Sequence, residues 1–141
     1  MIVADTGAIV ALADADDRHH RALRALWEED PEAWVLPWAI LPEVDSLLAE
    51  HVGERAAAAF RADLVSGAWA VEWGTEADLV RAQALCARHR SLRLGLVDGV
   101  VIGVAERVGS KAIATLDLRH FGAVDIQGHP ALLPRDLPAR A

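Results

Sequence analysis

Two aspartates stand behind short apolar runs near opposite ends of the chain. Asp5 directly follows the run 1–4, and Asp117 comes two positions after the run 111–115. Two more acids, Glu43 and Asp98, fall in the first turns of predicted helices. Each could be an ordinary cap, because an acid stabilises the start of a helix or closes a turn. The four acids together suggest that the fold brings their carboxylates close to one another.

Clustered carboxylates carry an electrostatic cost that helix dipoles cannot offset. Two of them about 5 Å apart repel by roughly 3 kcal/mol at an effective dielectric of about 20, whereas a helix dipole contributes about 0.3 to 1 kcal/mol. The group must therefore take up protons or hold a divalent cation. Oxygen ligands of this kind suit Mg²⁺ or Mn²⁺, ions that can activate water and clamp a phosphodiester.

The elements that would position these acids alternate between strand and helix. Apolar runs predict strands over 1–4, 33–37, 68–73 and 111–115, with a short fifth strand possible in 128–134. Helical spacing predicts helices over 6–15, 17–29, 40–51, 54–66, 75–90 and 97–109. Thr75 and Asp78 form a capping box, and Gly109 ends the last of these helices.

This alternation predicts an α/β fold in which helices cover both faces of a parallel sheet. The carboxyl ends of the strands and the starts of the following helices then lie along one edge, where sites form. All four acids map to that edge. A chain of 141 residues without repeats or linkers is expected to form one domain over 1–141.

The composition argues against a membrane protein and against a protein that coats nucleic acid nonspecifically. The chain is 53% hydrophobic, but its longest apolar run, 94–105, contains Asp98 and is well short of the roughly 20 residues that span a membrane. It has one cysteine and no basic segment before its first apolar residues, so we expect a cytoplasmic protein without membrane attachment. A net charge of −7 disfavours nonspecific coating of nucleic acid but leaves a local binding site open.

Four segments resemble a known family: VADTGAIVALADADDRHH, LPEVDSLL, LRLGLVDGVVIGVAERVG and AIATLDLRHFG. In this order they resemble the successive motifs of PIN-domain ribonucleases of the VapC toxin type, over nearly the whole chain. The resemblance implies a PIN-like α/β/α sandwich with a short, mostly parallel sheet of four to five strands. It also implies a Mg²⁺- or Mn²⁺-dependent endoribonuclease toxin that hydrolyses RNA and is inhibited by a small VapB-type antitoxin. Toxins of this kind are often homodimers.

The resemblance also assigns roles to residues. It implies a catalytic, metal-binding quartet of Asp5, Glu43, Asp98 and Asp117. Thr115 and Thr6 match hydroxyl positions near the quartet, where they would orient water or a carboxylate. Gly7 and Gly99 depart from the family pattern, which more often has Ser or Asn and Ala there, and this puts local helix stability in doubt more than the chemistry.

Other residues are weaker candidates for binding RNA. Arg18 and Arg21, about one helical turn apart, could contact phosphates together with Arg119 and His120, although a solvated helix face is the more common explanation of such a pattern. Trp38, just before the helix of Glu43, could stack a base or belong to the core.

Three alternatives compete with the nuclease hypothesis. A receiver-type phosphoacceptor needs a lysine at the end of its last core strand, but the single lysine, Lys111, begins a strand. A non-catalytic PIN-like module that binds RNA or protein remains an alternative, although an intact quartet argues against it. DNA cleavage would use the same chemistry, since only nucleic-acid geometry and the 2′-hydroxyl separate the substrates.

Overall fold

The five strands of the structure form one parallel sheet. In this computed structural model, which describes residues 1–138, the strands are β1 (Ile2–Ala4), β2 (Trp34–Pro37), β3 (Ala70–Glu72), β4 (Ala112–Ala114) and β5 (Ala131–Leu133). Their order is β3-β2-β1-β4-β5, and every neighbouring pair is parallel. In the central strand, Val3 is aligned with Val35 of β2 and with Ile113 of β4. The predicted parallel α/β fold is confirmed, including the fifth strand.

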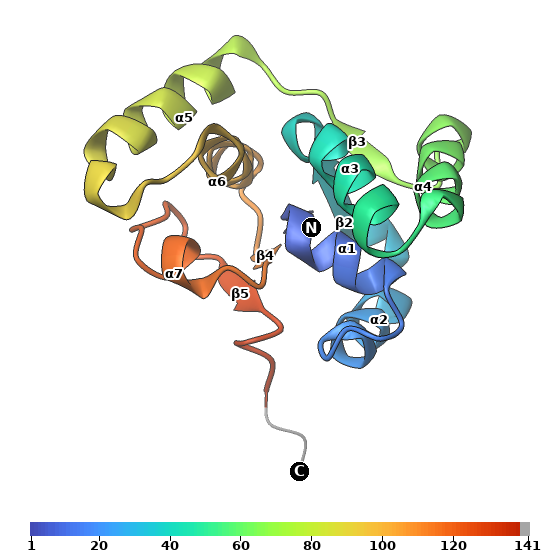
Figure 1. The fold of residues 1–141 in the computed structure, drawn as a ribbon. Helices are drawn as coiled ribbons and strands as arrows, with labels where there is room; N and C mark the ends of the chain where they lie inside the picture. Colours follow the sequence, from blue (N-terminus) through green and yellow to red (C-terminus); the bar gives the residue numbers. More distant parts are fainter. Residues whose placement is uncertain (139–141) are drawn as a thin grey trace.

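Helices cover both faces of this sheet. They are α1 (Thr6–Ala13), α2 (His20–Glu29), α3 (Leu41–His51), α4 (Glu54–Ser66), α5 (Glu76–Arg88), α6 (Leu96–Val108) and α7 (Leu118–Phe121). Short 3₁₀ turns lie at Pro31–Ala33, Trp38–Ile40 and Arg90–Leu92. Figure 1 shows α1 to α4 gathered on one side and α5 and α6 on the other, the arrangement of an α/β/α sandwich. No helix in residues 1–138 is long and apolar enough to cross a membrane.

The second helix begins later than the sequence predicts. The pattern indicated a helix from residue 17, whereas α2 begins at His20. The side chain of Asp14 accepts a hydrogen bond from the backbone N–H of Asp16, and that of Asp17 accepts one from His19 at 2.7 Å. These local bonds offer the backbone an alternative to the helix, which explains the turn between α1 and α2.

The core lies between the sheet and its helices. Both faces of the central strands are covered, so their residues are fully buried: Val3, Ala4, Leu36, Ile113 and Ala114 are all 0% exposed. Parallel strands buried on both faces read as continuous apolar runs, as they do here. The same burial leaves polar groups at the strand ends in a medium that disfavours charge.

Helices α5 and α6 pack closely because α6 has glycines at the contact. A methyl group placed on Gly99 would lie 2.9 Å from the carbonyl oxygen of Ala82, so α5 passes directly over it. Gly109 ends α6 in the left-handed region, at φ 63°, where glycine costs least. The predicted capping box of Thr75 and Asp78 is confirmed at the start of α5.

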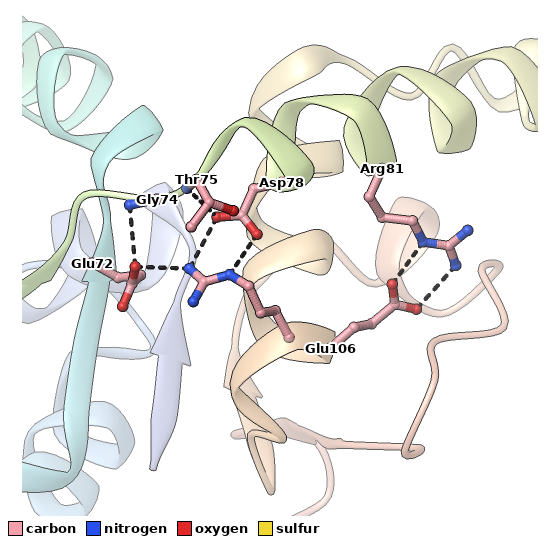
Figure 2. Close-up of polar contacts among 7 residues, drawn as sticks. Glu72, Gly74, Thr75, Asp78, Arg81 and Glu106 are labelled. Atoms are coloured by element: carbon pink, nitrogen blue, oxygen red, sulfur yellow. Dashed lines mark hydrogen bonds and ion pairs between the residues drawn. The ribbon is translucent and has the colours of Figure 1, made fainter.

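An ion-pair network holds the two helices together. Arg107 on α6 donates to both carboxylate oxygens of Asp78 on α5, at 2.7 and 2.9 Å, and to Glu72 at the end of β3 at 2.7 Å. Figure 2 shows Asp78 bonded back to Thr75, and Arg81 of α5 bonded through two nitrogens to Glu106 of α6. This network fixes the helix that carries Asp98.

Candidate active site

Asp5 is held at the carboxyl end of β1 by its neighbour strand. Its backbone N–H donates to the carbonyl of Ala114 at 2.8 Å, which continues the pairing of β1 with β4. Its Oδ2 accepts the hydroxyl hydrogen of Thr115 at 2.9 Å, and Thr115 in turn accepts from the backbone N–H of Asp117 at 3.1 Å. Thr115 therefore connects two acids of the predicted quartet, in keeping with an orienting role.

His120 contacts both Asp117 and Asp98. Its Nδ1 lies 2.7 Å from Oδ2 of Asp117 and 3.3 Å from Oδ2 of Asp98. Ligand atoms of Asp98, Asp117 and His120 all lie within 4.8 Å of one another, close enough to hold one metal ion. The other ring nitrogen, Nε2, lies 2.9 Å from the carbonyl oxygen of Leu92 and donates to it, since a carbonyl can only accept.

Glu43 lies at the rim of this group. It sits in the first turn of α3 and is exposed, but its negative charge raises the pKa of Asp98. Asp5 in turn is affected by the charges of Asp98 and Asp117. The structure therefore brings all four acids to one edge of the sheet, with Asp98, Asp117 and His120 the tightest group.

Burial and neighbouring charges shift the pKa values of Asp5, Asp98 and His120. Burial raises the pKa of Asp5 to about 6, against hydrogen bonds from Thr115 and Thr6, and the charges of Asp98 and Asp117 add to the rise. Burial also raises the pKa of Asp98, and the charges of Asp117 and Glu43 act in the same direction. Burial lowers the pKa of His120, but its contacts with Asp117, Leu92 and Asp98 outweigh this and leave it raised.

These groups suit a divalent cation. Asp5 is 6% exposed, and no cationic side chain pairs with it among residues 1–138. The hydroxyl oxygen of neighbouring Thr6 is buried without a hydrogen-bond partner, so a polar atom beside Asp5 is left unsatisfied. Carboxylate oxygens are the ligands that Mg²⁺ and Mn²⁺ prefer, and the aspartates of this site supply them.

Comparison with known proteins identifies the family. The PIN domain family profile matches residues 2–127. This chain is a PIN-domain protein. It is 30% identical over 123 residues to ribonuclease VapC26 of Mycobacterium tuberculosis, an alignment covering 87% of this chain and 91% of that protein.

A solved structure agrees with this assignment. The crystal structure of Mycobacterium tuberculosis VapC20, a toxin described as cleaving the sarcin-ricin loop, matches with a TM-score of 0.76 and 27% identity. The match covers 89% of this chain and 98% of that one. The predicted resemblance to VapC-type PIN domains and the PIN-like sandwich are confirmed.

The weaker candidates have different surroundings in this PIN domain. Arg18 and Arg21 line a hollow of about 620 Å³ together with other residues of α2 and with Leu137 and Pro138, and none of the four acids lines it. Trp38 is half-buried against the core, and a methyl group on Gly74 would lie 2.5 Å from its indole nitrogen. Arg119 is exposed on α7, next in sequence to His120.

His120 is the site residue that sequence reasoning undervalued. In sequence it reads as one more basic residue after Asp117, and its partners Asp98 and Leu92 are far from it along the chain. The available signal was its position three residues after Asp117, since residues three apart share a helix face.

Proposed function

We propose that this PIN domain is a Mg²⁺- or Mn²⁺-dependent endoribonuclease that acts as a toxin of the VapC type. The observation that carries the proposal is the meeting of Asp5, Asp98 and Asp117 at one sheet edge, with Glu43 at its rim. The named ribonuclease and toxin relatives support the same activity. We propose that residues 1–141 act as a single domain in this role.

The quartet would hold the metal. Asp98 and Asp117 lie within reach of one ion, and Asp5 lies beside them. A divalent ion bound there would supply positive charge to the phosphodiester and lower the pKa of water, so that water can attack phosphorus.

The surrounding residues would keep the carboxylates in position. The hydroxyl of Thr115 fixes Oδ2 of Asp5 and also receives the N–H of Asp117, so both acids keep one relative orientation. His120 holds a proton on Nδ1 between Asp98 and Asp117 when the imidazole is charged, and its Nε2 proton is committed to Leu92. Such preorganisation avoids reorganisation during the reaction.

The proposal includes two protein partners. A VapB-type antitoxin would restrain the enzyme, and a second copy of the chain would form a homodimer. Support for both partners comes from the toxin relatives, because the exposed apolar side chains Val65, Trp73 and Val80 lie in different segments and single residues of this kind are ordinary on a protein surface. Co-expression with a VapB-type antitoxin, followed by affinity capture and light scattering, tests both partners.

The decisive experiment measures cleavage of RNA. Purified protein is incubated with total RNA in EDTA, Mg²⁺ or Mn²⁺, and the new ends are mapped by sequencing. We expect discrete cuts with either metal and none in EDTA, and no cuts with Asp98→Asn. Binding of RNA without cleavage under all conditions would instead support the non-catalytic PIN-like module.

A further inference from the structure

Positive charge is concentrated in one short segment of an otherwise acidic chain. Between Asp78 and Asp98 there is no acidic residue, although the whole protein carries 21 acids against 14 lysines and arginines. Arg88 ends α5, and Arg90 and Arg93 lie in the connection from α5 to α6. We call residues 88–93 the basic turn.

The arginines of the basic turn have no carboxylate partners. Five arginines elsewhere in the chain form ion pairs within the protein: Arg24, Arg61, Arg81, Arg107 and Arg135. Arg88, Arg90 and Arg93 are exposed, and none has a carboxylate oxygen within 4.0 Å in residues 1–138. The same holds for Arg119 on α7. Their charges are therefore available to an external anion.

The basic turn lies directly beside the acidic site. The carbonyl oxygen of Leu92, in the middle of the turn, accepts a hydrogen bond from His120 Nε2 at 2.9 Å. The opposite nitrogen of the same ring lies 2.7 Å from Asp117 and 3.3 Å from Asp98. One imidazole ring thus separates the turn from the carboxylates, and Figure 1 shows the yellow connection after α5 next to α7.

The backbone of the turn is held in a defined shape. Leu92 and Arg93 donate to the carbonyls of His89 and Arg90 at 3.0 and 3.1 Å, and Leu94 is 6% exposed in the core. Arg93 has φ 54°, a left-handed conformation that costs free energy in a residue with a side chain. A preorganised turn loses less entropy when it binds a ligand.

We propose that Arg90 and Arg93 of the basic turn, with Arg119, bind the phosphates of the RNA strand on one side of the cleaved bond. The inference rests on the proposed ribonuclease function. The acids repel the phosphates of the substrate, so adjacent cationic groups are needed to hold the strand in place. Arginine suits this role, because its guanidinium binds phosphate through two parallel hydrogen bonds. Such contacts set the register of the strand without reading its sequence.

The test compares two double variants that change the charge equally. Arg90→Gln with Arg93→Gln removes the proposed contacts, whereas Arg55→Gln with Lys111→Gln removes two exposed charges that have no ion-pair partner in the described chain. Binding of a fluorescent single-stranded RNA that carries a mapped cleavage site is measured by anisotropy in the Asp98→Asn background. Cleavage of the same RNA is measured in the otherwise unchanged protein.

For the basic-turn variant we expect Kd and KM to rise at least 10-fold while kcat stays within about twofold. The slope of log Kd against log salt should fall by about 0.7 for each arginine that contacts a phosphate. The control variant should stay within twofold of the parent in every quantity. Arg119→Gln alone should show a smaller change in the same direction.

A further variant separates charge from folding. Arg90→Lys with Arg93→Lys keeps both charges and should keep most of the salt slope, even if both double variants lose some thermal stability. If the parent cleaves RNA while the glutamine variant keeps its Kd, KM and slope within twofold, the basic turn does not bind the substrate. Loss of antitoxin binding with unchanged RNA affinity also overturns the inference. If the parent neither binds nor cleaves RNA, the proposed function itself fails.

Discussion

Asp98 is surrounded by the other charged groups of the site. It lies 3.3 Å from His120, and the charges of Asp117 and Glu43 act on it. Its raised pKa means that its charged form is less stable in the folded protein than in the unfolded chain. In the absence of metal, the charged carboxylate therefore lowers the stability of the folded protein.

We expect Asp98→Asn to reduce RNA cleavage by at least about 100-fold, since loss of an outer-shell partner of a metal alone costs about 10- to 100-fold. In EDTA its thermal unfolding midpoint should equal or exceed that of the parent, because a destabilising charge is removed. Cleavage of RNA in the presence of Mn²⁺ checks the first point, and differential scanning calorimetry with and without Mn²⁺ checks the second. Mn²⁺ should raise the midpoint of the parent more than that of the variant. A clearly lower midpoint in EDTA would make Asp98 a structural cap.

Asp5 gives the site a measurable dependence on pH. In the folded protein its pKa is about 6, whereas its ordinary value is 3.8. As pH rises through this interval the unfolded chain loses its proton first, so the free energy of unfolding falls and then levels off above about pH 6. The Asp5 contribution to this fall is at most about 3 kcal/mol, from 1.36 kcal/mol for each pKa unit.

Urea denaturation in EDTA at several pH values between 4 and 7 tests this prediction. Asp5→Asn has no proton to lose, and its amide oxygen can still accept from Thr115, so its stability should change less over the same interval. Asp98 and the other acids titrate in both proteins, so the difference between the two curves isolates Asp5. Parallel curves would show that the pKa of Asp5 is not raised.

At the residue scale, sequence predicted the acids but not how they are held. Asp5 and Asp117 were recognisable because each follows an apolar strand, and Thr115 was expected near them. His120 bonds to Leu92, 28 positions away, and no local pattern reports such a contact. The pairing of Arg107 with Asp78 spans 29 positions and was missed for the same reason. Trp38 was left open between core and site, and packing against Gly74 accounts for its position.

At the scale of elements, the contact between α5 and α6 depends on a buried charge. The side chain of Asp78 is 2% exposed, and that of Arg107 is 33% exposed. Burial raises the pKa of Asp78, but the bonds from Arg107 and Thr75 outweigh this and lower it. Removal of one partner from such a pair leaves the other charge buried and uncompensated.

Arg107→Gln should therefore lower the free energy of unfolding by about 2 to 3 kcal/mol, less than for a fully buried pair because Arg107 is partly exposed. Arg24→Gln is the matched control, since Arg24 bonds Glu28 one turn away on the surface at 2.8 Å. An exposed pair of this kind contributes about 0.5 kcal/mol or less. Equal effects of the two variants in urea denaturation would contradict a structural role for the network.

Gly99 tests how closely α5 and α6 must pack. In Gly99→Ala the new methyl group would lie 2.9 Å from the Ala82 carbonyl oxygen and 3.0 Å from its Cα and Cβ, so the helices must separate. The steric cost of about 1 to 3 kcal/mol is offset by a helix-propensity gain of about 1 kcal/mol, so we expect a net loss of up to about 2 kcal/mol in urea denaturation. Cleavage should also fall, since Asp98 is the adjacent residue.

Gly103→Ala is the control one turn along the same helix. Its methyl group would lie 3.4 Å from the Asp78 carbonyl oxygen, an ordinary contact, so stability should be unchanged or slightly higher. If both alanine variants are equally stable, the helices can adjust and the glycine at 99 is not required. Glycines recur at 95, 99 and 103, a spacing of four that favours close helix packing, but only the structure shows that the contact with α5 is tightest at Gly99.

At the scale of the whole molecule, charge is separated into distinct regions. The protein carries a net charge of −7, yet the segment between Asp78 and Asp98 has arginines and no acids. Like charges at this excess disfavour nonspecific binding of RNA, so damage to a cell should require the acidic site and not merely abundant protein.

Expression in a bacterial host tests that requirement. The unmodified chain, induced without an antitoxin, should arrest growth, and Asp5→Ala should grow normally at the same protein level because a buried carboxylate of the site is lost. Asp16→Ala, which removes an exposed acid in the turn between α1 and α2, gives the same change in net charge and should still arrest growth. Co-expression of the antitoxin should restore growth of the unmodified strain without changing the amount of toxin. If the chain and Asp5→Ala are equally harmless, and the purified protein cuts no RNA with Mg²⁺ or Mn²⁺, the site does not act as a toxin nuclease.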